Sequence, residues 1–133
     1  MKNIEIVQIL DVYSASKADN KKVEELRLPA AVAWKRRVNL KRLIRAREVI
    51  DEALREIDQR YADDQHSDEV PAADGNRARA VKKEYLGEYM RERTDILMQD
   101  TDVTISAIKI GDLDGLSLSE SDMDTIAFMI EEE

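Results

Sequence analysis

Residues 28–61 read LPAAVAWKRRVNLKRLIRAREVIDEALREIDQRY, and this stretch decides the fold. Pro29 suits a first helical turn, where its missing N–H costs nothing. No glycine and no second proline follow before Pro71. Apolar residues recur at steps of three, four and seven, the spacing of a packed helical seam: Ala33, Leu40, Leu43, Ile50, Leu54, Ile57 and Tyr61. Residues 29–61 are therefore predicted to form one helix, roughly 50 Å long. Its buried face is expected to be widened by Ile44, Val49 and Ala53.

A helix of this length needs a partner, and residues 77–99 are predicted to supply it. Their apolar residues fall at helical spacing: Ala78, Val81, Tyr85, Leu86, Tyr89, Met90, Ile96 and Leu97. Charge favours an antiparallel hairpin, because the acidic end of the first helix would then meet Arg77, Arg79, Lys82 and Lys83. At the other end, Arg42 and Arg45 would lie near Glu88, Glu92 and Asp95. Exposed ion pairs contribute only about 0–1 kcal/mol each, so the pattern indicates orientation more than stability.

The segments outside the hairpin give shorter patterns. We expect a short strand or extended lead-in at 2–5, a helix at 6–15 and a mobile loop at 62–76. A β-like segment follows at 103–110. Because a lone strand is not stable in water, its partner would be residues 2–6, residues 116–118 or another chain. Ser119 is predicted to cap a terminal helix at 119–131.

Composition indicates one mainly α-helical domain. The chain has 133 residues, of which 43% are hydrophobic and 38% charged, a balance that suits elongated amphipathic helices. Only four glycines and two prolines are present, and there is no cysteine, which fits a reducing compartment. No run of about 18 apolar residues occurs. Asp11 interrupts the short apolar run near the N-terminus, whereas a signal peptide would need that run to continue. We expect no membrane association.

The charge distribution favours a protein partner over nucleic acid. The net charge is −8, which repels phosphate and attracts basic proteins. Residues 35–47 nevertheless hold seven bases and no acid, whereas Lys109 is the only base after residue 99. We interpret the basic stretch mainly as a solvated, salt-bridged face, with a nucleic-acid or acidic-protein contact as the alternative. The candidate partner-binding residues are Trp34, Lys35, Arg36, Arg37, Lys41, Arg42, Arg45, Asp122 and Asp124.

The sequence favours a non-enzyme. General acid–base and nucleophilic catalysis need an oriented pair of groups in a pocket. The single histidine, His66, lies in the predicted loop, and there is no cysteine. The acids around His66 offer no rigid frame for a metal ion, so we predict neither a metal site nor a cofactor.

The entry to the long helix carries a family resemblance. At 28–34 (LPAAVAW), followed by NLKRL at 39–43, the chain resembles a family of small uncharacterised proteins encoded by phages and prophages of Gram-positive bacteria. The resemblance extends to the amphipathic lead-in, the charged hairpin, the isoleucine-rich strand and the acidic helix beginning SESDMD at 119–124. The loop at 62–76 departs most. The family has no established catalytic residues, so the resemblance implies a phage setting alone.

These observations lead to three functional hypotheses. The first is a non-enzymatic phage accessory protein that binds another protein, for example an inhibitor of a host defence nuclease or effector complex. The second is a virion, tail or assembly component, and the third is a nucleic-acid-binding protein that uses residues 35–47. The expected location is accordingly the host cytoplasm or the virion. A hairpin that exposes much apolar surface is also compatible with a homodimer.

Overall fold

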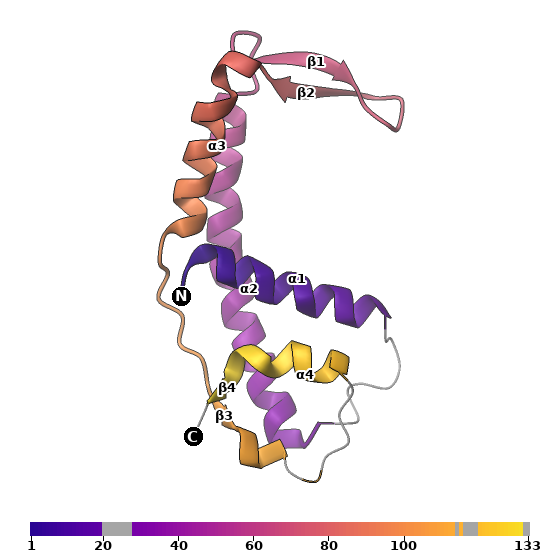
Figure 1. Cartoon of the computed structure of the whole chain (residues 1–133), viewed down its shortest axis with the longest axis vertical. Coiled ribbons are helices and arrows are strands. Elements are labelled where there is room, and N and C mark those ends of the chain that lie inside the picture. Colours follow the sequence, from indigo (N-terminus) through magenta and orange to yellow (C-terminus); the bar gives the residue numbers. More distant parts are fainter. Residues whose placement is uncertain (20–27, 114, 116–119, 132–133) are drawn as a thin grey trace.

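A computed structural model describes residues 1–19, 28–113, 115 and 120–131 of the chain. Its axis is α2 (Ala30–Arg60), a helix of 31 residues that begins directly after Pro29. The elements α1 (Asn3–Asp19), α3 (Lys83–Met98) and α4 (Glu120–Ile126) are arranged along it (Figure 1). The mainly helical fold and the long helix are thus confirmed. Among the described residues, no helix combines the length and the apolar character needed to cross a membrane.

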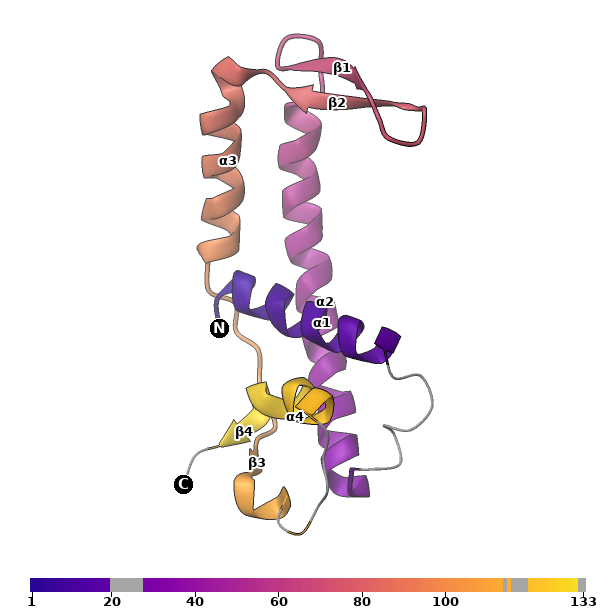
Figure 2. The same cartoon turned by 45° about the vertical axis from the view of Figure 1, so that its right-hand side comes forward.

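The chain returns beside α2 as an antiparallel hairpin, but only along the C-terminal half of that helix (Figure 2). Polar contacts fix the register. Asp58 accepts hydrogen bonds from Tyr89 (2.6 Å) and from Arg93, and Arg60 pairs with Glu92 at 2.9 Å. Because α3 has 16 residues against 31 in α2, it ends before it reaches the basic stretch. The expected approach of Arg42 and Arg45 to Glu88, Glu92 and Asp95 was therefore wrong.

The connection between α2 and α3 contains a hairpin of two strands, where the sequence analysis predicted only a loop at 62–76. Strand β1 (Ser67–Pro71) pairs antiparallel with β2 (Arg77–Val81). Gly75 takes a positive φ of 83° in the turn, and the Asp74 carboxylate accepts the Asn76 N–H at 3.1 Å. We call residues 67–81 the arm. It projects sideways from the end of the helical hairpin (Figure 1).

Both ends of the chain also differ from expectation. α1 begins at Asn3 rather than residue 6, and Lys2 forms a single β-bridge with Asp100. The β-like segment 103–110 is reduced to β3 (Ile108–Lys109), which pairs in parallel with β4 (Ile130–Glu131) rather than with any expected partner. The predicted terminal helix divides into α4 and a short 3₁₀ turn, η3 (Ala127–Met129), before β4. A second 3₁₀ turn, η2 (Ile110–Leu113), follows β3. The predicted cap at residue 119 lies outside the described residues.

The buried core lies along the N-terminal two thirds of α2. One cluster forms where α1 crosses α2, from Ile6, Leu10, Leu40, Leu43 and Ile50. A second joins the start of α2 to the C-terminal elements, from Leu28, Val32, Ile108, Leu113, Ile126 and Met129. In contrast, no residue of α3 is buried. We call the arm, α3 and the adjoining C-terminal half of α2 the distal end. Here α2 and α3 lie side by side, and no further described element packs across them (Figure 2).

Candidate binding surfaces

The basic stretch of α2 divides into an inward and an outward set. The inward cations hold other parts of the chain. Lys35 donates to the Ala107 carbonyl at 3.2 Å, and Arg42 donates to the Thr104 carbonyl at 2.9 Å. These contacts fasten the segment before β3 to α2, which leaves both side chains occupied within their own fold.

Arg36 and Asp122 belong to the buried core. The Arg36 guanidinium donates to the Thr125 hydroxyl at 2.9 Å. That hydroxyl in turn donates to the Asp122 carbonyl oxygen at 2.8 Å. Arg36 is 9% and Asp122 only 1% exposed, so neither presents its charge to a partner, whereas Asp124 of the same helix is exposed.

The outward set lies on the opposite side of α2. Trp34 is 64% exposed, and Arg37, Lys41 and Arg45 are also exposed. None of these three cations makes an ion pair with a described residue. We call this side of α2 the outer face: Trp34, Arg37, Lys41, Ile44, Arg45, Glu48, Val49, Glu52 and Glu56.

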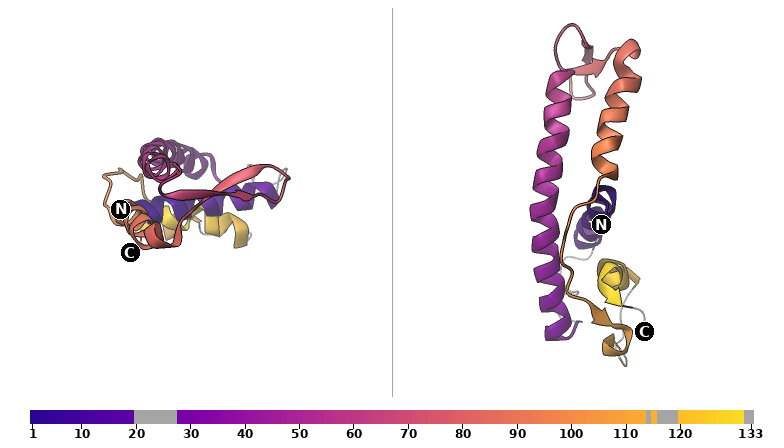
Figure 3. Two further views of the ribbon diagram at one scale, coloured as in Figure 1. Left: turned by 90° about the horizontal axis from the view of Figure 1, so that it is seen from above. Right: turned by 90° about the vertical axis from the view of Figure 1, so that its left-hand side faces the viewer.

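Ile44 and Val49 were expected to widen the buried seam, and this expectation was wrong. Ile44 is 46% exposed and Val49 is 72% exposed. The partners of α2 all lie on one side of it (Figure 3, right), which limits the buried stripe to a narrow band. Two apolar side chains consequently remain on the outer face, next to the free cations.

Aromatic rings form a cluster where the arm joins the helical hairpin. The Tyr61 ring makes edge contacts with the rings of His66 and Tyr89, both at 5.3 Å between centroids. The His66 ring also lies 4.6 Å from that of Tyr85. Edge-to-face rings at this separation stabilise each other beyond the area that they bury. The sequence places Tyr85 and Tyr89 one turn apart, but nothing in it shows that His66 joins them.

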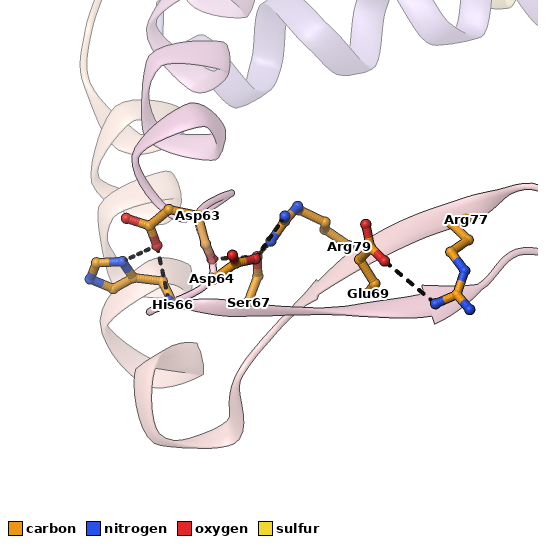
Figure 4. A network of polar contacts seen from close by, with 7 residues as sticks. All are labelled: Asp63, Asp64, His66, Ser67, Glu69, Arg77 and Arg79. Carbon is orange, nitrogen blue, oxygen red and sulfur yellow. Dashed lines mark hydrogen bonds and ion pairs between the residues drawn. The ribbon is translucent and has the colours of Figure 1, made fainter.

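Polar contacts fix the arm to this cluster (Figure 4). The Asp63 carboxylate accepts the backbone N–H of His66 at 3.0 Å and lies 2.6 Å from its Nδ1. The hydrogen bond with His66 lowers the pKa of the Asp63 carboxyl below its usual value. Further along, Arg79 pairs with Asp64 at 2.9 Å, and Arg77 pairs with Glu69 at 3.4 Å. The two arginines were expected to meet the acidic end of α2. Instead, Arg77 pairs within the arm and Arg79 pairs with Asp64, in the turn before it.

The contact between Asp63 and His66, where the arm joins the helical hairpin, is predicted to weaken in acid. A carboxyl whose pKa is lower in the folded state stabilises that state while it is ionised. The contribution of Asp63 is therefore complete above the ordinary aspartate pKa, and it is lost as the pH falls through the lowered folded value. Amide exchange of residues 66–81 followed across this range tests the prediction. Asp63→Asn should abolish the pH-dependent step, whereas a carboxyl that titrates above the ordinary aspartate value would contradict it.

The two faces of the arm differ because side chains alternate along a strand. The paired positions Glu69 and Arg79 share one face, together with Arg77. Val70 opposite Ala78, with Ala80 beside them, lies on the other. Ala78 and Ala80 are exposed and Val70 is half-buried. The arm therefore carries one salt-bridged face and one face on which the exposed Asp68 accompanies three small apolar side chains.

The outer side of α3 is apolar as well. Leu86 is 44% exposed and Met90 is 52% exposed, although both were expected to be buried. They are four residues apart and so lie on one stripe of the helix. On its inner side, α3 contributes Glu92, whose hydrogen bond with the Tyr61 hydroxyl is the largest influence raising the pKa of that tyrosine to about 12.

An open groove lies between α2 and α3 at the distal end. Its volume is about 300 Å³, and it is lined by Ala53, Glu56, Ile57, Arg60, Glu92, Asp95 and Ile96. Arg60 and Glu92 pair with each other within this lining. Among the described residues, no three acidic or histidine side chains gather where they could hold a metal ion.

Comparison with protein-family models, with curated proteins and with solved structures finds no match for the chain. Its function is therefore argued from the surfaces that it presents.

Proposed function

We propose that this chain is a non-enzymatic protein that acts by binding another protein through its distal end. The observation that carries the proposal is the exposure of α3, which contributes no buried residue and leaves Leu86 and Met90 about half exposed. A two-stranded ribbon such as the arm is also only marginally stable in water. A partner that covers both would bury apolar surface and stabilise the arm.

The two parts of the distal end suit different kinds of contact. The arm has two strands and no third, so either strand can accept an added strand from a partner by main-chain hydrogen bonding. Leu86 and Met90 form a helical stripe that suits an apolar groove or another helix. Methionine adapts to irregular surfaces, which favours Met90 as a contact residue.

The setting that we propose is a phage-infected bacterium, on the basis of the resemblance at residues 28–43. Within that setting, the leading role is inhibition of a host factor such as a defence nuclease or effector complex. The net charge of −8 supports it, because an acidic protein is steered toward basic partners. The alternative is a virion or assembly role. It differs from inhibition of a host factor in its partner, which would be a phage structural protein.

Substitution on the α3 stripe tests the binding surface. Leu86→Glu with Met90→Glu should reduce capture of the partner at least tenfold, because two carboxylates would have to be buried at the contact. Tagged protein is used to capture partners from nuclease-treated lysates of a Gram-positive host, with and without phage infection, and these are identified by mass spectrometry. Val12→Glu with Ile110→Glu is the matched control, since both residues are exposed and apolar but lie away from the distal end.

The result separates the proposed roles. A host protein captured in stoichiometric amounts by the wild type and the control, but not by the α3 variant, supports inhibition of a host factor. Phage structural proteins captured with the same pattern would replace that role by assembly. A partner retained equally by the α3 variant would overturn the assignment of the distal end.

A further inference from the structure

No other element in the part of the chain that the structure describes covers the outer face of α2, although Glu56 near its end also lines the groove beside α3. The elements α3, α1 and α4 follow one another along the opposite side (Figure 3, right). The three apolar side chains of the outer face are well exposed: Trp34 at 64%, Ile44 at 46% and Val49 at 72%. A helix of 31 residues is thus packed on one side only in the part of the chain that the structure describes.

The charges on this face are sorted by sign. Arg37, Lys41 and Arg45 follow one another at intervals of four residues, and they are followed by Glu48, Glu52 and Glu56 at the same interval. Residues four apart are neighbours on a helix, and like charges at this spacing destabilise it. Arg55 relieves one member of the acidic run by pairing with Glu52 at 2.8 Å. The arrangement is therefore unfavourable for α2 alone, apart from the Arg55–Glu52 pair and the position where Arg45 precedes Glu48 by three residues.

A second copy of the same helix, running antiparallel, would resolve this conflict. If the two-fold axis passes between residues 46 and 47, Arg45 lies opposite Glu48, Lys41 opposite Glu52 and Arg37 opposite Glu56. In each of these pairs the two residues are equally far from the axis along the chain. Ile44 and Val49 obey the same relation along the axis, but they are five residues apart and therefore lie on opposite edges of the face, where each flanks the charged rows. We infer that the outer face binds a second copy of this chain as an antiparallel α2–α2 dimer.

Alternative arrangements fit the same face less well. In a parallel dimer each residue would meet its own copy, so the basic run would face a basic run and the acidic run an acidic one. An antiparallel register shifted by one turn would place Arg37 opposite Arg60. Like charges placed opposite each other select against a wrong partner or register. The sorted charges thus specify the orientation of the dimer. They favour the unshifted register by number alone, because it forms three opposite-charge pairs, whereas the shift by one turn keeps two, Lys41 with Glu56 and Arg45 with Glu52.

The contact would be long and sensitive to salt. Trp34 would lie opposite Gln59 of the second copy, and the helix between these two positions is about 38 Å long at ~1.5 Å per residue. Two such helices stay in contact over that length when they cross at roughly 20°. Exposed charges are screened beyond about 10 Å at 0.1 M salt and beyond about 3 Å at 1 M. Nucleic acid fits the face poorly, because the acidic run continues directly from the basic one.

Charge reversal tests the dimer with an internal rescue. The first variant reverses the basic run (Arg37→Glu, Lys41→Glu, Arg45→Glu), and the second reverses the acidic run (Glu48→Lys, Glu52→Lys, Glu56→Lys). We expect the wild type to sediment at twice its chain mass of 15.3 kDa at about 50 mM salt and to dissociate at about 1 M. Each variant alone should dimerise at least a hundredfold more weakly. An equimolar mixture of the two should form a one-to-one heterodimer.

A matched control distinguishes the effect of losing the specific charge pairs from the effect of a change in net charge. Lys83→Glu, Arg91→Glu and Lys109→Glu change the net charge by the same amount as the first variant, at exposed positions away from the outer face. This control should remain dimeric. Circular dichroism of every variant shows whether its helices are retained, so that loss of the dimer is not mistaken for unfolding.

Cysteine cross-linking tests the register, since the chain has no cysteine of its own. A mixture of Lys41→Cys and Glu52→Cys should give a disulfide-linked heterodimer. Either variant alone should not cross-link, because the two copies of residue 41 would lie about 16 Å apart along the helix axis.

Three results would overturn the inference. The first is a wild type that stays monomeric at about 50 mM salt at concentrations up to its solubility limit. The second is a mixture of the two charge variants that remains monomeric. The third is a monomeric wild type whose band shift with nucleic acid disappears in the first variant, which would assign the face to nucleic acid. Partner capture by the distal end can fail or succeed independently of all three.

Discussion

Leu43→Ala is expected to lower the free energy of unfolding by about 2–5 kcal/mol, the range for removing a large apolar side chain from a core. Leu43 is 0% exposed and lies in the cluster where α1 crosses α2. The half-buried Ile96 and Leu97 of α3 and Val103 and Ile105 of the following segment pack on the same cluster. Alanine would leave a cavity that these separate elements cannot all close. Urea unfolding at one protein concentration measures the loss.

Val12→Ala provides the comparison for this variant. Val12 is 43% exposed on α1, so its replacement removes little buried surface and should change the free energy of unfolding by less than about 1 kcal/mol. We also expect Leu43→Ala to increase amide exchange in α1, because Ile6 and Leu10 of α1 pack in the same cluster as Leu43. A cost below about 1 kcal/mol for Leu43→Ala would contradict its position at the centre of the core.

The sequence predicted the axis of the fold because α2 is periodic over many turns. Five of the seven seam residues named from the spacing are buried: Leu40, Leu43, Ile50, Ile57 and Tyr61. The prediction failed where exposure depends on the number of partners, as at Ile44 and Val49. A stripe of apolar residues shows that a helix is amphipathic, but it does not show how many elements pack against that helix.

The two small sheets were harder to predict, for physical reasons that differ. The arm shows only a short alternation of arginine and alanine at residues 77–80. Ion pairs such as Arg77 with Glu69 and the cluster around His66 hold it in place. The pairing of β3 with β4 involves two residues on each strand, which is too short for a pattern. Its position is set by the packing of Ile108 and Met129 in one cluster, which depends on the whole fold.

The candidate site could be predicted only in part. The composition of residues 35–47 identified the cations, and three of them with Trp34 are exposed. The inward cations could not be distinguished, because Lys35 and Arg42 bind backbone carbonyls of Ala107 and Thr104. Every residue has a backbone carbonyl, so the sequence does not show which carbonyls accept these hydrogen bonds. The exposed stripe of α3 was missed for a related reason, since its periodicity resembles that of a buried helix.

Asn39 is a buried polar residue that holds the C-terminal region to α2, and its role could not be predicted from the sequence. Its side chain is 0% exposed. Its Nδ2 donates to the Ser106 carbonyl at 2.9 Å, and its Oδ1 accepts the Ser106 N–H at 2.8 Å. The amide thus pairs with the backbone as a neighbouring strand would, and it joins the segment before β3 to α2.

Asn39→Ala should cost about 2–4 kcal/mol, because two partly buried backbone groups of Ser106 lose their partners. Urea unfolding measures this cost, and amide exchange at Ser106 should increase with it. Thr104→Ala is the control, since the Thr104 side chain is exposed in the same segment. A variant as stable as the control would mean that water replaces both hydrogen bonds at no cost.

Asn39→Asp distinguishes the two hydrogen bonds by pH. A neutral carboxyl can donate to the Ser106 carbonyl and accept its N–H, whereas the ionised form cannot donate and leaves a charge in the core. Both effects raise the folded pKa of the new aspartate above its unfolded value of about 3.9. Because its pKa is raised on folding, the variant should be close to the wild type near pH 3 and should lose stability as the pH rises from about 4 through the folded pKa. A stability difference from the wild type that does not change with pH would show that the donor from Asn39 contributes nothing to holding this segment on α2.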